Sequence, residues 1–114
     1  IEAHGFEVLH HEALGIVNNN EVGRLDPEAA YEMGRRVDRP DADAVMLGCG
    51  NWWTMCVVER LERELGKPVL TTNGVSIWAA LRILQSHASV PGYGRLLRDY
   101  LGPETVPAKL ASAA

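Results

Sequence analysis

The chain has 114 residues, a length typical of a single domain, and its 46% hydrophobic and 23% charged residues are ordinary for a globular protein. A formal net charge of −4 offers no basis for binding nucleic acid or an anionic membrane surface. No apolar run approaches the roughly 20 residues that cross a bilayer, and no signal peptide opens the sequence, so we expect no membrane partner and a cytoplasmic location.

The opening residues are unusual for the start of a protein. Ile1 to His4 followed by Gly5 is typical of the last turn of a helix closed by a C-cap glycine, and no methionine precedes it. We therefore expect these residues to be part of a longer protein. Residues 6–11, which include Phe6 and Val8, are predicted to form a first strand.

The following elements alternate between helix and strand. Asp26 as N-cap and Pro27 at the first helical position predict a helix that runs to Val37. The pattern then predicts strands at residues 44–48 and 68–72, a helix from Trp52 to Leu65, a helix after the cap residue Asn73 to about Leu84, and a short helix at residues 93–101. Residues 1–101 are thus predicted to form one α/β domain with a parallel sheet, followed by a tail at residues 102–114.

Cys49 is the most prominent candidate for chemistry. It follows the buried-strand pattern of residues 44–47 and is flanked by Gly48 and Gly50, which places a thiol at the carboxyl end of a strand, where α/β sheets bind ligands. A helix that begins near Trp52 would favour its thiolate form. Free cysteines are also among the most buried residues, so the local sequence leaves a reactive role and a packing role equally open.

Three polar loops are predicted to meet around this thiol, because the carboxyl ends of parallel strands lie at one edge of a sheet. The first loop carries Asn18 and Asn19, the second carries Cys49 and Asn51, and the third carries Thr72 and Asn73. Together they offer neutral hydrogen-bond donors and helix N-termini, which suit a carboxylate substrate. Each of these residues alone could simply cap a helix or a turn.

The other reactive side chains fit this site less well. Cys49 and Cys56 are seven residues apart and match neither a CxxC redox motif nor a disulfide framework. Cys56 is predicted to share the helix face of Trp52, opposite the core-facing residues. His10 and His11 would point to opposite faces of a strand and could not easily bind one metal ion, so we expect no metal site.

The order and spacing of several motifs resemble the carboxyl-terminal half of the Asp/Glu/hydantoin racemase superfamily, in its branch of maleate isomerases and arylmalonate decarboxylases. The resemblance extends from Gly5 to about Leu97 and rests on these elements: Gly15-Ile16 with the asparagines and Gly23-Arg24-Leu25, Asp41 to Ala44, Cys49 with Asn51, Leu65 to Val69, Asn73, Trp78 with Leu81-Arg82, and Gly92 to Leu97.

The resemblance implies a flavodoxin-like, three-layer half of a fold with two similar halves, each giving one catalytic cysteine to a site between them. Cys49 matches the cysteine of the second half. The first half and the opening strand of the second half are absent from this sequence, and Cys56 does not match the partner cysteine. The family works without cofactors, so we expect none.

The resemblance leaves three reactions open. A maleate-type isomerase adds a thiolate to a double bond, a racemase exchanges an α-proton between two cysteines, and a decarboxylase protonates an enediolate with one cysteine. We expect cis–trans isomerisation of a small dicarboxylate, with Asn18, Asn19, Asn51, Thr72 and Asn73 binding it beside Cys49. A non-catalytic module that binds a small anion is the alternative from another functional class. A homo-oligomer is also conceivable.

Overall fold

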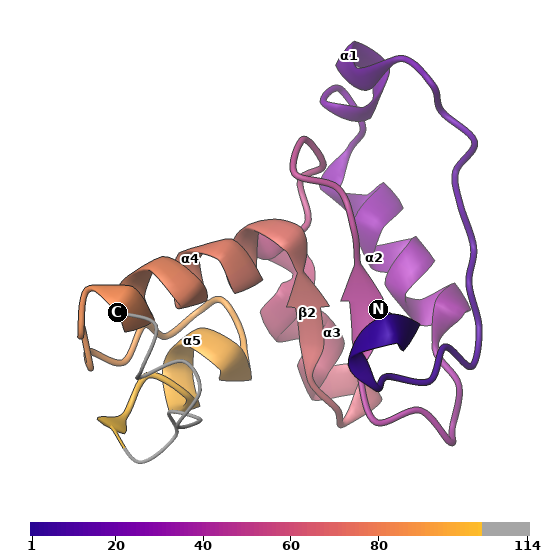
Figure 1. The fold of residues 1–114 in the computed structure, drawn as a ribbon. Helices are drawn as coiled ribbons and strands as arrows, with labels where there is room; N and C mark the ends of the chain where they lie inside the picture. The colour runs from indigo at the N-terminus through magenta and orange to yellow at the C-terminus, as the bar shows by residue number, and fades with distance from the viewer. Residues whose placement is uncertain (104–114) are drawn as a thin grey trace.

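The computed structural model describes residues 1–103, which contain two short parallel strands and several helices (Figure 1). In chain order the elements are η1 (Glu2–His4), α1 (Asn19–Val22), α2 (Pro27–Val37), β1 (Val45–Leu47), η2 (Met55–Val57), α3 (Val58–Leu65), β2 (Val69–Thr71), α4 (Thr72–Ile83) and α5 (Arg95–Asp99). The tail predicted at residues 102–114 lies outside the described residues from residue 104 onward.

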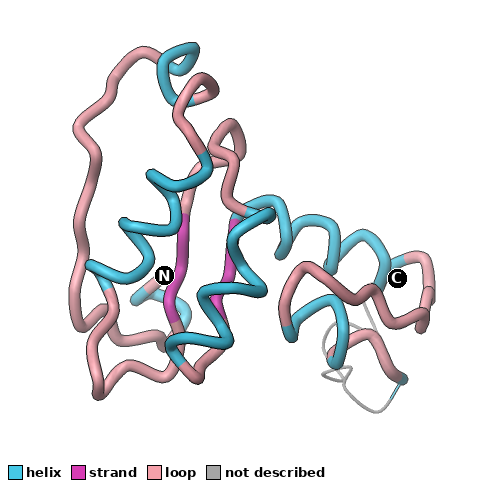
Figure 2. The backbone as a smooth tube through the Cα atoms, turned by 180° about the vertical axis from the view of Figure 1, so that it is seen from behind, coloured by secondary structure: helices cyan, strands magenta, loops and turns pink. Residues whose placement is uncertain are grey.

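The two strands form the predicted parallel pair, with Val45 opposite Val69 and Leu47 opposite Thr71. Helices α2 and α3 lie on the same face of this sheet (Figure 2). Val45 and Leu47 are 4% and 2% exposed, whereas Met46 between them is 48% exposed. Residues 1–103 therefore form two of the three expected layers, the sheet and one layer of helices.

The core lies between this sheet and the two helices. Leu61 of α3 and Ala30 of α2 are fully buried there, with Val45 and Val69 from the strands. Each large aliphatic side chain buried in this way contributes roughly 1.5–3 kcal/mol to stability. Burial of these side chains fixes the positions at which the two strands end.

Helix α2 follows the sequence prediction closely. Asp26 is its N-cap and accepts a hydrogen bond from Glu28 N at 2.8 Å, Pro27 is its first residue, and Val37 is its last. A polar residue at the cap and proline at the first position satisfy the free N–H groups of a helix start. Gly5 also closes η1 as a C-cap in the left-handed region, with φ of 86°.

The first predicted strand is wrong. Residues 6–11 form no strand, and no backbone hydrogen bond joins residues 6–17 to β1 in the described part of the chain. A cavity of about 440 Å³ separates residues 11–17 from β1, so the segment has no neighbouring strand with which to pair. Phe6 remains 66% exposed as a result.

Two helix starts also differ from the prediction. Trp52 N donates to Cys49 O and Thr54 N donates to Trp52 O, so residues 49–52 and 52–54 form consecutive turns, and helical structure begins only at Met55. Trp52 is buried in the core and does not share the exposed face of Cys56, because burial of the indole outweighs continuation of the helix. Helix α4 is capped by Thr71, whose Oγ1 accepts from Gly74 N at 2.9 Å, so Asn73 lies inside this helix.

Candidate active site

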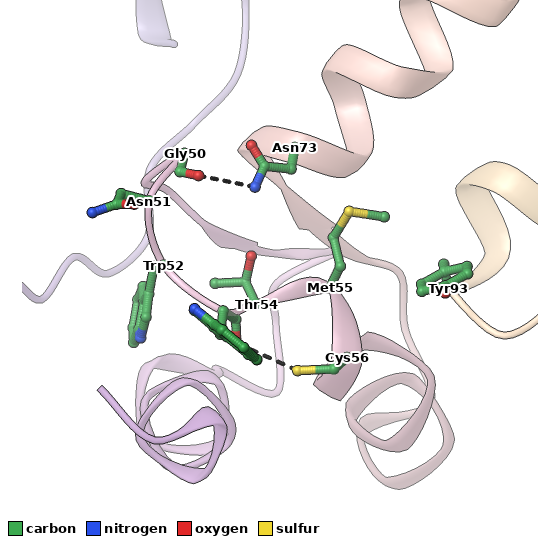
Figure 3. A pocket seen from close by; sticks show the side chains of 9 residues that line it. Gly50, Asn51, Trp52, Thr54, Met55, Cys56, Asn73 and Tyr93 are labelled. Carbon is green, nitrogen blue, oxygen red and sulfur yellow. Dashed lines mark hydrogen bonds between the residues drawn. The ribbon is translucent and has the colours of Figure 1, made fainter. Parts of the chain in front are cut away.

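Hydrogen bonds join the three polar loops at the carboxyl ends of β1 and β2. Asn51 Nδ2 donates to Asn19 O at 2.7 Å, Cys49 N donates to Thr72 Oγ1 at 3.1 Å, and Asn73 Nδ2 donates to Gly50 O at 3.0 Å (Figure 3). Each bond connects two different loops. The prediction that the loops meet at this edge of the sheet is therefore confirmed.

Cys49 lies two residues after Leu47, the last residue of β1, and is only partly exposed. Its side chain packs against the hydrophobic core and lines the cavity of about 440 Å³, together with residues 11–17 and Trp52. We call this space the thiol cavity. No helix begins at Trp52, so the helix start joined to Cys49 is that of α4, through the bond to Thr72.

The amide side chains of the loops hold backbone in place. Asn18 caps α1 by accepting a hydrogen bond from Asn20 N at 2.9 Å, which is the common role of asparagine at a helix start. Asn51 and Asn73 use their N–H groups to hold neighbouring loops. The bonds of Asn51 and Asn73 hold the loop that follows Cys49, and among residues 1–103 no donor is bonded to the amide oxygens of these two side chains.

Gly23 makes the position of Asn51 possible. A Cβ atom at residue 23 would lie 2.8 Å from Asn51 Nδ2, closer than real side chains approach. The sequence analysis used Gly23 only as part of a motif. The structure shows that its missing side chain leaves room for the amide that joins two loops.

A second pocket, of about 340 Å³, is lined by Gly50 and Asn51 (Figure 3), and Trp52 lines both this pocket and the thiol cavity. We call it the Asn73 pocket, and its walls include Asn51, Thr54, Met55, Cys56, Asn73 and Tyr93. Cys49 lines the thiol cavity, whereas Asn51 and Asn73 line this pocket, so the six predicted site residues do not share one cavity. Asn18, Asn19 and Thr72 line neither space.

Thr54 and Tyr93 are pocket residues that the sequence analysis missed. Tyr93 stands between two glycines in the motif of residues 92–97, a signal that could have indicated an exposed side chain on a tight turn. Thr54 carries no comparable signal. Its burial follows from the turn at residues 52–54, which the sequence does not predict.

The two cysteines have different surroundings. Cys56 is exposed in η2, and its Sγ donates to Trp53 O at 3.6 Å. Cys56 lines the Asn73 pocket but not the thiol cavity, so it does not face Cys49 across a shared space.

An ion-pair network holds the segment on the far side of the thiol cavity. Glu12 accepts from His10 Nε2 at 3.0 Å and from Arg36 Nε at 2.6 Å. The hydrogen bond from His10 and the guanidinium of Arg36 lower the pKa of the Glu12 carboxyl below its ordinary value. Residues 1–103 contain no cluster of three His, Cys, Asp or Glu side chains that could hold a metal ion, nor a helix long and apolar enough to span a membrane.

Comparison with known proteins places this site in a family of enzymes. The family model described as arylmalonate decarboxylase matches residues 1–97. Maleate isomerase of Nocardia farcinica is 36% identical over 100 residues, which are 87% of this chain and 40% of that protein. Arylmalonate decarboxylase of Bordetella bronchiseptica is 33% identical over 90 residues, or 76% of this chain and 38% of that protein.

Solved structures give the same result. Nocardia farcinica maleate cis-trans isomerase bound to TRIS superposes with a TM-score of 0.81 at 37% identity, over 85% of this chain and 40% of that chain. A cysteine-to-serine variant of that enzyme, with a covalently bound succinylcysteine intermediate, gives a TM-score of 0.78 over the same shares. The chain spans about 40% of the length of these relatives, which agrees with the expected carboxyl-terminal half.

The match over most of the chain, together with the parallel strands and the joined loops, confirms the resemblance and the α/β fold class stated from the sequence. The chain belongs to the arylmalonate decarboxylase family.

Proposed function

We propose that this chain supplies one side of a cofactor-independent active site for isomerisation of a small dicarboxylate, with Cys49 as one of two catalytic thiols. The single observation that carries the proposal is the position of Cys49 two residues after the end of β1, with its backbone N–H held by Thr72. A maleate cis-trans isomerase that superposes on this chain carries a succinylcysteine in a variant with one cysteine replaced by serine, which supports two thiols in that enzyme.

The proposed chemistry is thiol addition followed by elimination. One of the two thiolates forms a bond from its Sγ to one alkene carbon of maleate, and the π electrons move onto the adjacent carboxylate as an enediolate. The former carbon–carbon double bond is now single, and rotation about it followed by return of the electron pair expels the thiolate and gives the trans acid. Donors beside the carboxylate stabilise the enediolate.

The loop residues divide between two roles in this proposal. Thr72, Asn51 and Asn73 position the backbone of residues 49–51 through the three bonds between loops. Asn18 and Asn19 follow the cavity-lining residues Ile16 and Val17 in the chain, and we assign them to the substrate carboxylates. The partner of this half is the remaining part of a longer protein, one with the length of the relatives, and that part supplies the second thiol.

The proposal is tested by extending the reading frame upstream of Ile1. The longer protein should contain a second cysteine at the end of a strand and should convert maleate to its trans isomer. Cys49→Ala should abolish turnover and Cys56→Ala should retain it, because only Cys49 lines the thiol cavity. Turnover that survives Cys49→Ala would refute the assignment.

These 114 residues alone should not turn over maleate, an arylmalonate, aspartate or a hydantoin. The reactions need groups on both sides of the substrate, and this chain carries one side. Turnover by the monomeric chain would contradict the two-sided site. Arylmalonate decarboxylation is the second candidate, favoured by the family model over residues 1–97, and product analysis with both substrates separates the two.

A further inference from the structure

Two exposed aromatic side chains line the Asn73 pocket. Trp53 is 61% exposed and Tyr93 is 47% exposed, and Met55 lines the pocket with them. The adjacent indole of Trp52 is only 7% exposed, so the core of residues 1–103 buries one tryptophan of this pair and leaves the other open to solvent. Tryptophan, tyrosine and methionine are the side chains that protein–protein interfaces favour over the rest of the surface.

The same pocket is free of charged side chains. Within residues 1–103 none of its lining residues is Lys, Arg, Asp or Glu, although these types make up 23% of the chain. The core of a protein interface is depleted of charged residues and enriched in aromatic residues, whereas the surrounding surface remains polar. The composition of the pocket is therefore that of an interface core.

Hydrogen bonds fix one wall of this pocket in advance. Glu59 of α3 accepts a hydrogen bond from Gly94 N at 2.9 Å, and Glu62 accepts one from Arg95 N at 2.8 Å. These two bonds hold the turn that carries Tyr93 against α3. A surface that is already ordered loses little conformational freedom when a partner docks on it, which favours binding.

We propose that Trp53, Met55 and Tyr93 form a docking surface for the upstream part of the same protein, with Trp53 as its anchor. The chain spans about 40% of the length of its relatives, so a larger part of such a protein lies outside these residues. The pocket begins at Gly50 and Asn51, next to Cys49, where the upstream part must bring the second thiol. The inference thus rests on the proposed function. An apolar side chain of the upstream part packs against the indole and fills the pocket.

Fluorine NMR of the longer protein, labelled with fluorotryptophan, tests whether the indole is covered. The resonance of Trp53 is identified by its absence in Trp53→Phe, and the change of its shift from H₂O to D₂O reports contact with solvent. We expect this change to be as small as that of the buried Trp52. A change several-fold larger than that of Trp52 would overturn the proposal. Protection that disappears on dilution would also overturn it, because a second copy of the protein would then cover Trp53.

Two variants test whether Trp53 anchors the interface. Trp53→Ala should lower the urea midpoint of the longer protein, and Trp53→Phe should lower it less, because phenylalanine keeps part of the buried apolar area. Equal midpoints in both variants and the parent protein would overturn the anchor role. Cys49→Ala should leave the solvent protection of Trp53 unchanged. Turnover that survives Cys49→Ala would refute the proposed function without altering this protection, so the two failures are distinguishable.

Discussion

The body formed by α2, β1, α3 and β2 and the segment of residues 6–17 both contain many apolar residues, but only the body buries them. Leu47 and Leu61 are 2% and 0% exposed, whereas Phe6 and Val17 are 66% and 98% exposed. The body has two faces that pack together, while the segment is separated from β1 by the thiol cavity. An apolar pattern thus gives structure only where a packing partner is present.

The difference in packing is tested by truncating one leucine side chain in each region and comparing the losses of stability. Leu61→Ala should lower the free energy of unfolding by about 2–5 kcal/mol, because it leaves a cavity between the two helices and the sheet. Leu9→Ala in the segment, at a position 42% exposed, should change it by less than about 0.5 kcal/mol.

Urea unfolding of both variants measures this difference. Equal losses of stability would show that the segment packs as tightly as the body.

The buried carboxylate of Glu62 connects the body to α5, the last helix in the described part of the chain. Glu62 is 5% exposed and accepts from Val69 N at 3.0 Å and from Arg95 N at 2.8 Å, so it joins the starts of β2 and α5 to α3. Glu62→Ala should cost about 2–3 kcal/mol, because hydrogen bonds to a charged group are lost and two N–H groups are left without an acceptor.

Hydrogen exchange at Val69 and Arg95 should accelerate with the loss of stability. Glu32→Ala, at an exposed position of α2, is the matched control and should have a smaller effect. A smaller loss for Glu62→Ala than for Glu32→Ala would contradict the role of the buried carboxylate.

The attachment of the segment should depend on pH. His10 and Arg36 lower the pKa of Glu12 in the folded state. The stability that this carboxylate contributes is therefore present above the ordinary glutamate pKa of about 4.3 and is lost as pH falls through the lower, folded value. Below that value the carboxyl is neutral and the bond to Arg36 weakens.

NMR shifts of Arg36 Nε and of the amides of residues 11–14 should follow this titration, while the amides of β1 stay unchanged. Arg36→Gln should reduce the response of residues 11–14 without abolishing it, because His10 still bonds to Glu12. Titration of β1 together with the segment would indicate that the two regions do not respond separately.

The same contrast explains what the sequence predicted. The helix from Pro27 to Val37 and the parallel pairing of β1 with β2 follow from local caps and apolar patterns, so these elements were predicted correctly. The strand at residues 6–11 was wrong because a strand needs a hydrogen-bonded neighbour, which no local pattern reveals.

The candidate site was predictable to a similar degree. The meeting of the three loops follows from the parallel order of the strands and was predicted. The position of Trp52 in the core was not predicted. The turn after Cys49 depends on which of the two neighbouring indoles, Trp52 or Trp53, can be buried, and the local sequence does not reveal this. That turn also places Thr54 beside the Asn73 pocket, so this residue could not be found from its neighbours in the sequence.

The most direct test of the central claim compares the two cysteines within one chain. Iodoacetamide is a neutral reagent, and mass spectrometry reads the labelling rate at each thiol near neutral pH. Cys49 should react faster although Cys56 is more exposed, because Cys49 is joined to the start of α4, whereas Cys56 donates to Trp53 O. Faster labelling of Cys56 would contradict the assignment of Cys49 as the reactive thiol.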